Sequence, residues 1–117
     1  MSTPKLLLQI EGALVLLATI LFYRHLHASW LLFAVLFLAP DLFMLGYLAG
    51  SRIGAACYNF VHTYLTPAAL IAISLLAAKP ISLPIATIWI CHIGFDRMLG
   101  FGLKYPTAFK DTHLQRV

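Results

Sequence analysis

Charged side chains are scarce in this chain, which has four acids and eight lysines and arginines among 117 residues. They make up 10% of the sequence, whereas a soluble domain carries about 25%. With 62% hydrophobic residues, too little polar surface remains to cover a water-soluble domain of this size. The net charge of +4 is spread over loops and tail without a dense basic patch, which argues against nucleic acid as a partner.

Cysteine is also rare. Cys57 and Cys91 lie inside or at the edge of apolar runs, without the spacing of a zinc site, so we interpret them as free buried thiols. No serine or cysteine has a recognisable partner base, which argues against an enzyme that uses a side-chain nucleophile.

Long apolar runs are present instead, each long enough to cross a bilayer, which takes about 20 helical residues. We therefore predict an all-α fold, a four-helix transmembrane bundle forming a single domain over residues 1–117. The predicted helices cover about 6–23, 30–49, 57–78 and 81–103, followed by a polar tail over 104–117. Pro67 is expected to kink or break the third helix.

An even number of spans places both termini on one side of the membrane, and the positive-inside rule selects the side. Two basic residues, Arg24 and Lys79, lie on one side. The basic residues of the other side are Lys5, Arg52, Lys104, Lys110 and Arg116. This asymmetry predicts that both termini are cytoplasmic. Tyr23 and Trp30 fit the positions of an interfacial aromatic belt, as do Tyr105 and Phe109.

Ionisable residues recur at one depth in all four predicted helices. With a rise of about 1.5 Å per residue, they lie within roughly 5–15 Å of the cytoplasmic face. Ionisable groups inside a membrane are costly and usually mark a functional site. The five residues are Glu11, Asp41, His62, His92 and Asp96.

Carboxylates and imidazoles together suit zinc, manganese or iron. His92 and Asp96 are four residues apart and share one helical face, so both can bind one ion. Helical bundles hold metals with such side chains from facing helices. We therefore predict that Asp41, His62, His92 and Asp96 bind a metal, and that Glu11 is a further ligand or the general base.

Other polar residues fit supporting roles. Tyr58 and Asn59 lie one turn before His62 and could orient it or a substrate, while Arg97 could hold an anionic group or pair with an acid. Two alternatives to metal binding remain open: a proton-linked or packing network of the same residues, or unrelated local roles for each of them.

Several stretches in combination resemble a family of small bacterial four-helix membrane proteins, domain of unknown function 4260. The resemblance covers nearly the whole chain, and the matching stretches are QIEGALVLLA, APDLFMLGYLAG, YNFVHTYLTP, HIGFDRMLGFGLKYP and FKDTHL. It implies a short integral-membrane protein of the bacterial cytoplasmic membrane and no established activity.

Three functions are compatible with these observations. The first is a metal-dependent hydrolase acting on a lipid-like substrate. The second is a small proton-coupled transporter, because the length and Glu11 are similar to small-multidrug-resistance proteins, although the additional acids and histidines depart from that family. The third is a structural or accessory subunit. Besides membrane lipid, a second copy is an expected partner, through the G-x-x-x-G pair Gly46 and Gly50.

Overall fold

The computed structural model of the protein describes residues 3–77, 82–103 and 112–116. These residues form helices and no strand, which confirms the all-α prediction for them. The helices are α1 (Thr3–His25), α2 (Trp30–Leu36), the 3-10 helix η1 (Ala39–Ala49), α3 (Ser51–His62), α4 (Leu65–Ala77), α5 (Ser82–Leu99) and α6 (His113–Arg116).

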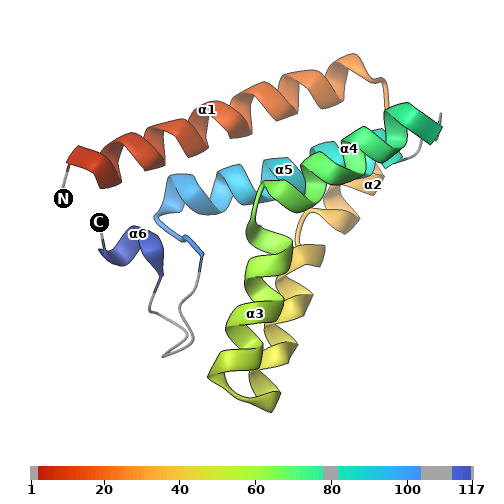
Figure 1. Cartoon of the computed structure of the whole chain (residues 1–117). Coiled ribbons are helices and arrows are strands. Elements are labelled where there is room, and N and C mark those ends of the chain that lie inside the picture. The colour runs from red at the N-terminus through yellow and green to blue at the C-terminus, as the bar shows by residue number, and fades with distance from the viewer. Residues whose placement is uncertain (1–2, 78–81, 104–111, 117) are drawn as a thin grey trace.

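The longest helices, α1 and α5, run antiparallel and pack closely together (Figure 1). Two glycines permit this approach. A Cβ on Gly12 would lie 2.5 Å from the Cβ of Arg97, and one on Gly94 would lie 2.9 Å from the backbone nitrogen of Leu16. The two backbones therefore touch without intervening side chains, which fixes α5 against α1.

The second predicted helix is broken in two. Regular α-helix ends at Leu36, and Pro40 lies at the start of η1, where its missing N–H costs no hydrogen bond. The η1 helix then continues for 11 residues, although most 3-10 helices stop after three or four. The predicted bounds 30–49 match one apolar helical stretch, Trp30–Ala49, but the expectation of a regular helix throughout was wrong, because 3-10 geometry replaces it after Leu36.

The third predicted helix also differs. It begins earlier than expected, at Ser51, and is interrupted after His62, where Thr63 is extended with φ −95° and ψ 143°. The next helix, α4, carries Pro67 in its first turn and is bent by 44° relative to α3. The predicted break at Pro67 is thereby confirmed, while the predicted end at 78 lies outside the described residues.

The fourth predicted helix is shorter than expected and ends at Leu99. Gly100, with φ +95°, allows the amide of Phe101 to donate to the carbonyl of Asp96. The Gly100 amide donates to the carbonyl of Arg97, which completes a Schellman C-cap. The predicted continuation to 103 was wrong because glycine in this conformation stops the helix.

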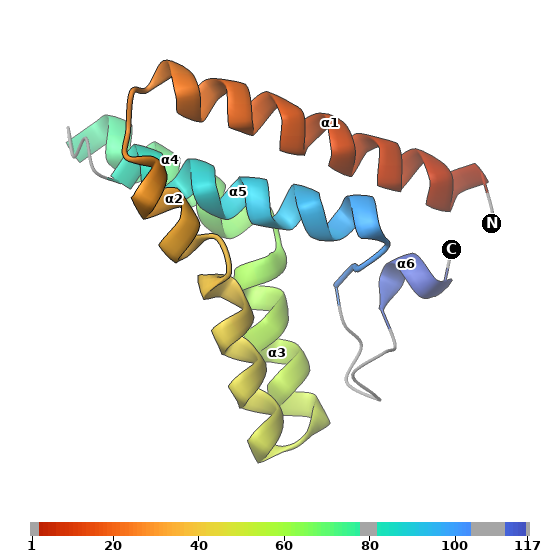
Figure 2. The same ribbon diagram turned by 180° about the vertical axis from the view of Figure 1, so that it is seen from behind.

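Figures 1 and 2 show how these helices converge. The helix pair η1 and α3 forms a hairpin that projects crosswise from the α1–α5 pair, while α4 packs along α5. The short helix α6 lies near the N-terminal end of α1. The ends of the hairpin nearest α5 carry Asp41 and His62, so the fold directs both residues toward one face of α5.

Two segments are long and apolar enough to cross a membrane: α1, and Trp30–Ala49 taken together. The bent pair α3 and α4 adds a third if it forms a single span. Within the described residues, the structure thus supports two or three spans by length and composition. The count of four and the cytoplasmic placement of the termini stay predictions.

The aromatic residues near the α1–α2 connection do not all behave as an interfacial belt. Tyr23 is fully buried, and its hydroxyl donates to the carbonyl of Ser29. Its ring lies 5.0 Å from Trp30 and 5.2 Å from Phe33 between ring centroids. The belt prediction for Tyr23 was therefore wrong, whereas Trp30 is half exposed. Tyr105 and Phe109 lie outside the described residues.

Candidate metal centre

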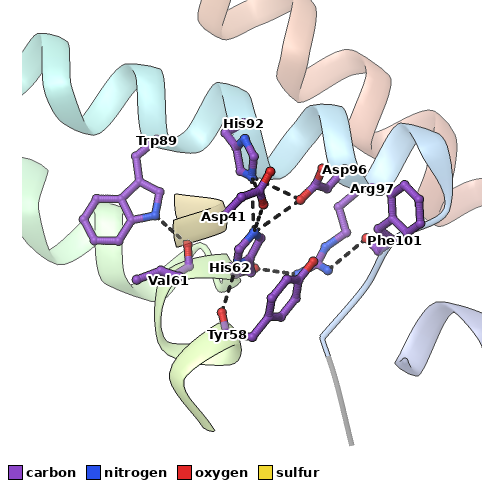
Figure 3. A network of polar contacts seen from close by, with 9 residues as sticks. All are labelled: Asp41, Tyr58, Val61, His62, Trp89, His92, Asp96, Arg97 and Phe101. Carbon is purple, nitrogen blue, oxygen red and sulfur yellow. Dashed lines mark hydrogen bonds and ion pairs between the residues drawn. The ribbon is translucent and has the colours of Figure 1, made fainter. Parts of the chain in front are cut away.

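Four of the five residues selected by depth converge on one point (Figure 3). Asp41 comes from the first turn of η1, His62 from the last residue of α3, and both His92 and Asp96 from α5. One ligand atom from each lies within 4.8 Å of the other three. The structure therefore brings these four residues together in a group that could hold a metal ion, while their role as ligands stays a prediction.

Five of the six separations within the group are nearly equal. His62 Nε2 lies 3.2 Å from His92 Nε2 and 3.2 Å from Asp41 Oδ1. His92 Nε2 lies 3.1 Å from Asp41 Oδ1. The Oδ2 atom of Asp96 is 3.4 Å from His62 Nε2 and 3.2 Å from His92 Nε2. Two nitrogens and two carboxylates thus face a common centre.

A single hydrogen bond from each Nε2 cannot account for all the close contacts of these atoms. Each imidazole Nε2 can donate one hydrogen bond, yet each lies 3.1–3.4 Å from two carboxylate oxygens and the other ring. The five separations do match a metal site. With bonds of about 2.0–2.2 Å, ligand atoms lie about 3.3–3.6 Å apart in a tetrahedron and about 2.8–3.1 Å apart at adjacent octahedral positions. The group could therefore hold one divalent ion.

The orientation of His62 follows from its place on α3. Its Nδ1 donates to the carbonyl of Tyr58, 2.9 Å away and one turn earlier, and the two rings stack with centroids 3.7 Å apart. A neutral ring with Nδ1 protonated carries its lone pair on Nε2, the atom that faces the group. Backbone carbonyls commonly orient metal-binding histidines in this way. Tyr58 therefore contacts His62 directly, and its supporting role at a metal stays a prediction.

Two side chains of α5 hold the end of α3, whose last carbonyls have no partner within that helix. The indole Nε1 of Trp89 donates to the carbonyl of Val61 at 2.5 Å. The guanidinium of Arg97 donates to the carbonyl of His62 at 3.0 Å and to that of Phe101 at 3.4 Å. Trp89 and Arg97 lie on the helical face that also carries His92 and Asp96, so one face of α5 both supplies and positions ligands (Figure 3).

A family described as Domain of unknown function (DUF4260) matches residues 5–117. The chain belongs to this family. The match confirms the resemblance noted from the sequence, although it carries no activity and leaves a bacterial origin untested. No curated protein and no solved structure matches the chain. The function of this DUF4260 chain must therefore be argued from the geometry of its site.

The burial of the ligand residues is graded. The side chains of His62 and His92 are 1% exposed, that of Asp96 is 14% exposed and that of Asp41 is 32% exposed. Asp41 is thus the outermost member and lies where an ion or small molecule would enter. The His92 ring packs edge-on against Phe37, and its Nδ1 is buried with no hydrogen-bond partner among the described residues. His92 is therefore held by packing and by its Nε2 contacts.

The other residues that the sequence suggested for the site, Glu11, Asn59 and Arg97, lie outside the four-residue group. Glu11 lies on the exposed side of α1 and is not a member of the four-residue group. Asn59 is half-buried on α3, and its carbonyl caps that helix by accepting from the amide of Thr63. The described contacts of Arg97 include two carbonyls and the ring of Tyr64, 5.8 Å from its central carbon. The catalytic roles predicted for Glu11 and Arg97 stay predictions.

Sequence reasoning missed Trp89 and Phe37, which orient the site through Val61 and His92. For Trp89 a signal was available, because it precedes His92 by three residues and so shares its helical face. No such sequence signal existed for Phe37, because its contact with His92 depends on the break between α2 and η1.

The described part of the C-terminal tail folds back onto the protein. His113 Nδ1 accepts from the amide of Leu103 at 2.7 Å, and the His113 amide donates to the Leu103 carbonyl at 2.8 Å. Leu114 is fully buried. Burial and the charge of Arg97 lower the pKa of His113 below its ordinary value of 6.5. The segment is therefore anchored by a neutral histidine.

Proposed function

We propose that this protein binds one divalent metal ion inside a helical membrane domain through Asp41, His62, His92 and Asp96. One observation carries the proposal: five nearly equal separations of 3.1–3.4 Å among two imidazole nitrogens and two carboxylate oxygens. The hydrogen bond from His62 Nδ1 to the Tyr58 carbonyl supports it, because it leaves the Nε2 lone pair directed at the ion.

Zinc, manganese and iron all suit two nitrogens and two carboxylate oxygens. A structural zinc site would use all four as a closed tetrahedron, whereas a catalytic site keeps a position open for water. The exposure of Asp41 supports the second arrangement, because the most accessible carboxylate can release the ion and make room for water or substrate.

We further propose that the metal serves hydrolysis of a lipid-like substrate. A bound ion makes water a better nucleophile at neutral pH and polarises the bond under attack. Asp41 is the carboxylate best placed to accept the proton of that water. Sequence reasoning gave this role to Glu11, but the exposed position of Glu11 on α1, outside the four-residue group, favours Asp41.

Location and partners form part of the same proposal. We place the protein in the bacterial cytoplasmic membrane with both ends in the cytoplasm, as the distribution of lysine and arginine predicts. A second copy stays a proposed partner, although Gly46 faces Cys57 and Gly54 of its own chain, and Gly50, with φ +117°, forms the turn between η1 and α3. A dimer would therefore use another part of Gly46's helix.

Proton-coupled transport is the second candidate, and a specific observation favours it. Both histidines lie within 3.4 Å of both aspartates, so each ring, as an imidazolium, would pair with a carboxylate without metal. Metal and protons compete for the same nitrogens, so the two functions are distinguished by what the purified protein contains.

Elemental analysis of tag-free, detergent-purified protein tests the proposal. We expect about one zinc, manganese or iron ion per wild-type chain and almost none in His92→Ala. His25→Ala is the matched control, because His25 is exposed at the end of α1 and should retain the metal. Stoichiometric metal in both the wild type and His92→Ala would refute the site. Absence of metal from both proteins would favour proton coupling.

A further inference from the structure

An apolar cavity of about 180 Å³ lies among α2, η1, α3 and α5. Its lining residues are Leu36, Ala39, Pro40, Phe60, Val61, Ile85, Ile88 and Trp89. None of them is charged. A cavity of about 150 Å³ holds a benzene-sized molecule, so this one has room for about six carbon atoms.

The cavity adjoins the candidate metal centre through three pairs of residues. Pro40 precedes Asp41, Val61 precedes His62, and Trp89 lies one helical turn before His92. Figure 3 shows Trp89 and Val61 on one side of the four ligands, with Arg97 and Phe101 on the other. A molecule that fills the cavity therefore has one end beside the metal ligands.

The chemistry of the lining selects the occupant. The only side-chain donor in the wall, the indole N–H of Trp89, is already bound to the carbonyl of Val61. A water molecule needs two to four polar partners to be held in a cavity, and this wall offers almost none. Hydrocarbon is therefore the material that the cavity accommodates at least cost.

We propose that the cavity binds the first carbons of a single-chain amphiphile whose anionic oxygen headgroup, a phosphate or carboxylate, lies at the metal. This inference rests on the proposed metal site and specifies its substrate: the cavity holds the chain while the headgroup oxygens reach the ion. Chain and headgroup are then bound together, so removal of the metal must weaken binding of the chain.

Fluorescence of Trp89 provides a direct test. The chain has two tryptophans, so Trp30→Phe leaves Trp89 as the sole emitter in the cavity wall. An alkyl phosphate brominated along its first carbons is titrated into this protein in unlabelled lipid nanodiscs, with zinc and after chelation. With zinc, we expect the probe to quench Trp89 fluorescence saturably, as binding to one site requires. After chelation, the apparent affinity for the alkyl phosphate should be at least tenfold weaker. A brominated alcohol of equal length should bind as weakly with zinc as without.

Cavity-filling variants supply the matched controls. Ala39→Leu and Ile85→Phe each place extra carbons in the cavity and should abolish saturable quenching while metal content is retained. Ala34→Leu introduces the same side chain as Ala39→Leu on the exposed side of α2. Its Trp89 fluorescence should be quenched by the probe to the same extent as in the parent protein.

Two results would overturn the inference. Quenching that rises linearly with brominated probe would show that Trp89 contacts bulk lipid, and saturable quenching unaffected by both filling variants would place the chain elsewhere. If the samples contain stoichiometric metal in either case, only this inference fails. If they contain no metal, the proposed function fails, and the substrate assignment fails with it.

Discussion

Arg97 connects two parts of the molecule that lie 35 residues apart in sequence, because its guanidinium donates to the carbonyl of His62. That carbonyl belongs to a residue of the proposed metal site, so Arg97 would position His62 without touching the ion. Mutation of such supporting groups typically costs 10–100-fold in metal affinity. Arg97 is buried, and its charge is satisfied in part by the carbonyl of His62 at the C-terminal end of α3.

We therefore expect Arg97→Lys to weaken metal binding about tenfold, because an ammonium cannot reproduce the forked contact with two carbonyls. Competition against a chromophoric chelator measures the change. Arg24→Lys, at the exposed end of α1, is the matched control and should bind as wild type does. Wild-type affinity in Arg97→Lys would mean that α3 is held adequately by Trp89 alone.

Gly12 determines how closely α1 and α5 approach. Gly12→Ala would place a Cβ 2.5 Å from the Cβ of Arg97 and 2.7 Å from the backbone nitrogen of Met98, so the helices must separate. Overpacking of this kind costs about 1–3 kcal/mol. We expect a lower unfolding temperature in detergent and, because Arg97 moves, weaker metal binding. Ala18→Val, which adds bulk on the exposed side of α1, should change neither quantity.

At the scale of elements, the C-terminal helix α6 should respond to pH. The pKa of His113 is lowered in the folded protein, mainly by burial, so its stabilising contribution is complete above its ordinary value of 6.5 and is lost as the pH falls below that. Protonation removes the acceptor that Nδ1 offers to the Leu103 amide. We expect faster hydrogen exchange at residue 103 and in α6 below pH 6.5, after correction for intrinsic rates.

His113→Asn supplies the control for that pH response, because an asparagine side chain does not titrate. Exchange in this variant should show no step between pH 7 and pH 5. If hydrogen exchange in His113→Asn showed the same pH-dependent step as in the wild type, another group would be responsible for the titration. His113 would then have only a structural role.

The sequence sufficed to select the four residues that cluster in the candidate site, but not to predict the fold that brings them together. Depth within each apolar run selected Asp41, His62, His92 and Asp96, because helical rise converts residue number into distance. Pro67 correctly marked a break. The crosswise hairpin could not be predicted, since it depends on how η1 and α3 pack, and the polar start of α3 resembled a loop. The pair Gly12 and Gly94, 82 residues apart, has no spacing signal at all.

On the scale of the whole molecule, the proposed ion would connect η1, α3 and α5. A ligand that binds only the folded state stabilises it, by about 2.7 kcal/mol at a hundredfold excess over Kd. Chelation should therefore lower the unfolding temperature of the wild type and leave His92→Ala unchanged. Hydrogen exchange should increase in the η1–α3 hairpin and in the second half of α5. Uniform protection before and after chelation would contradict a connecting role.

The separation of the ligands along the chain has a consequence for biosynthesis. Asp41 and His62 lie 21 residues apart, and His92 follows His62 by another 30. In the proposed membrane protein, the first two ligands would therefore be inserted well before α5 has left the ribosome, and two ligands would hold an ion only weakly. The full set exists once Asp96 has emerged and α5 has docked against α1. Metal uptake would thus report that synthesis and insertion of the helical domain are complete.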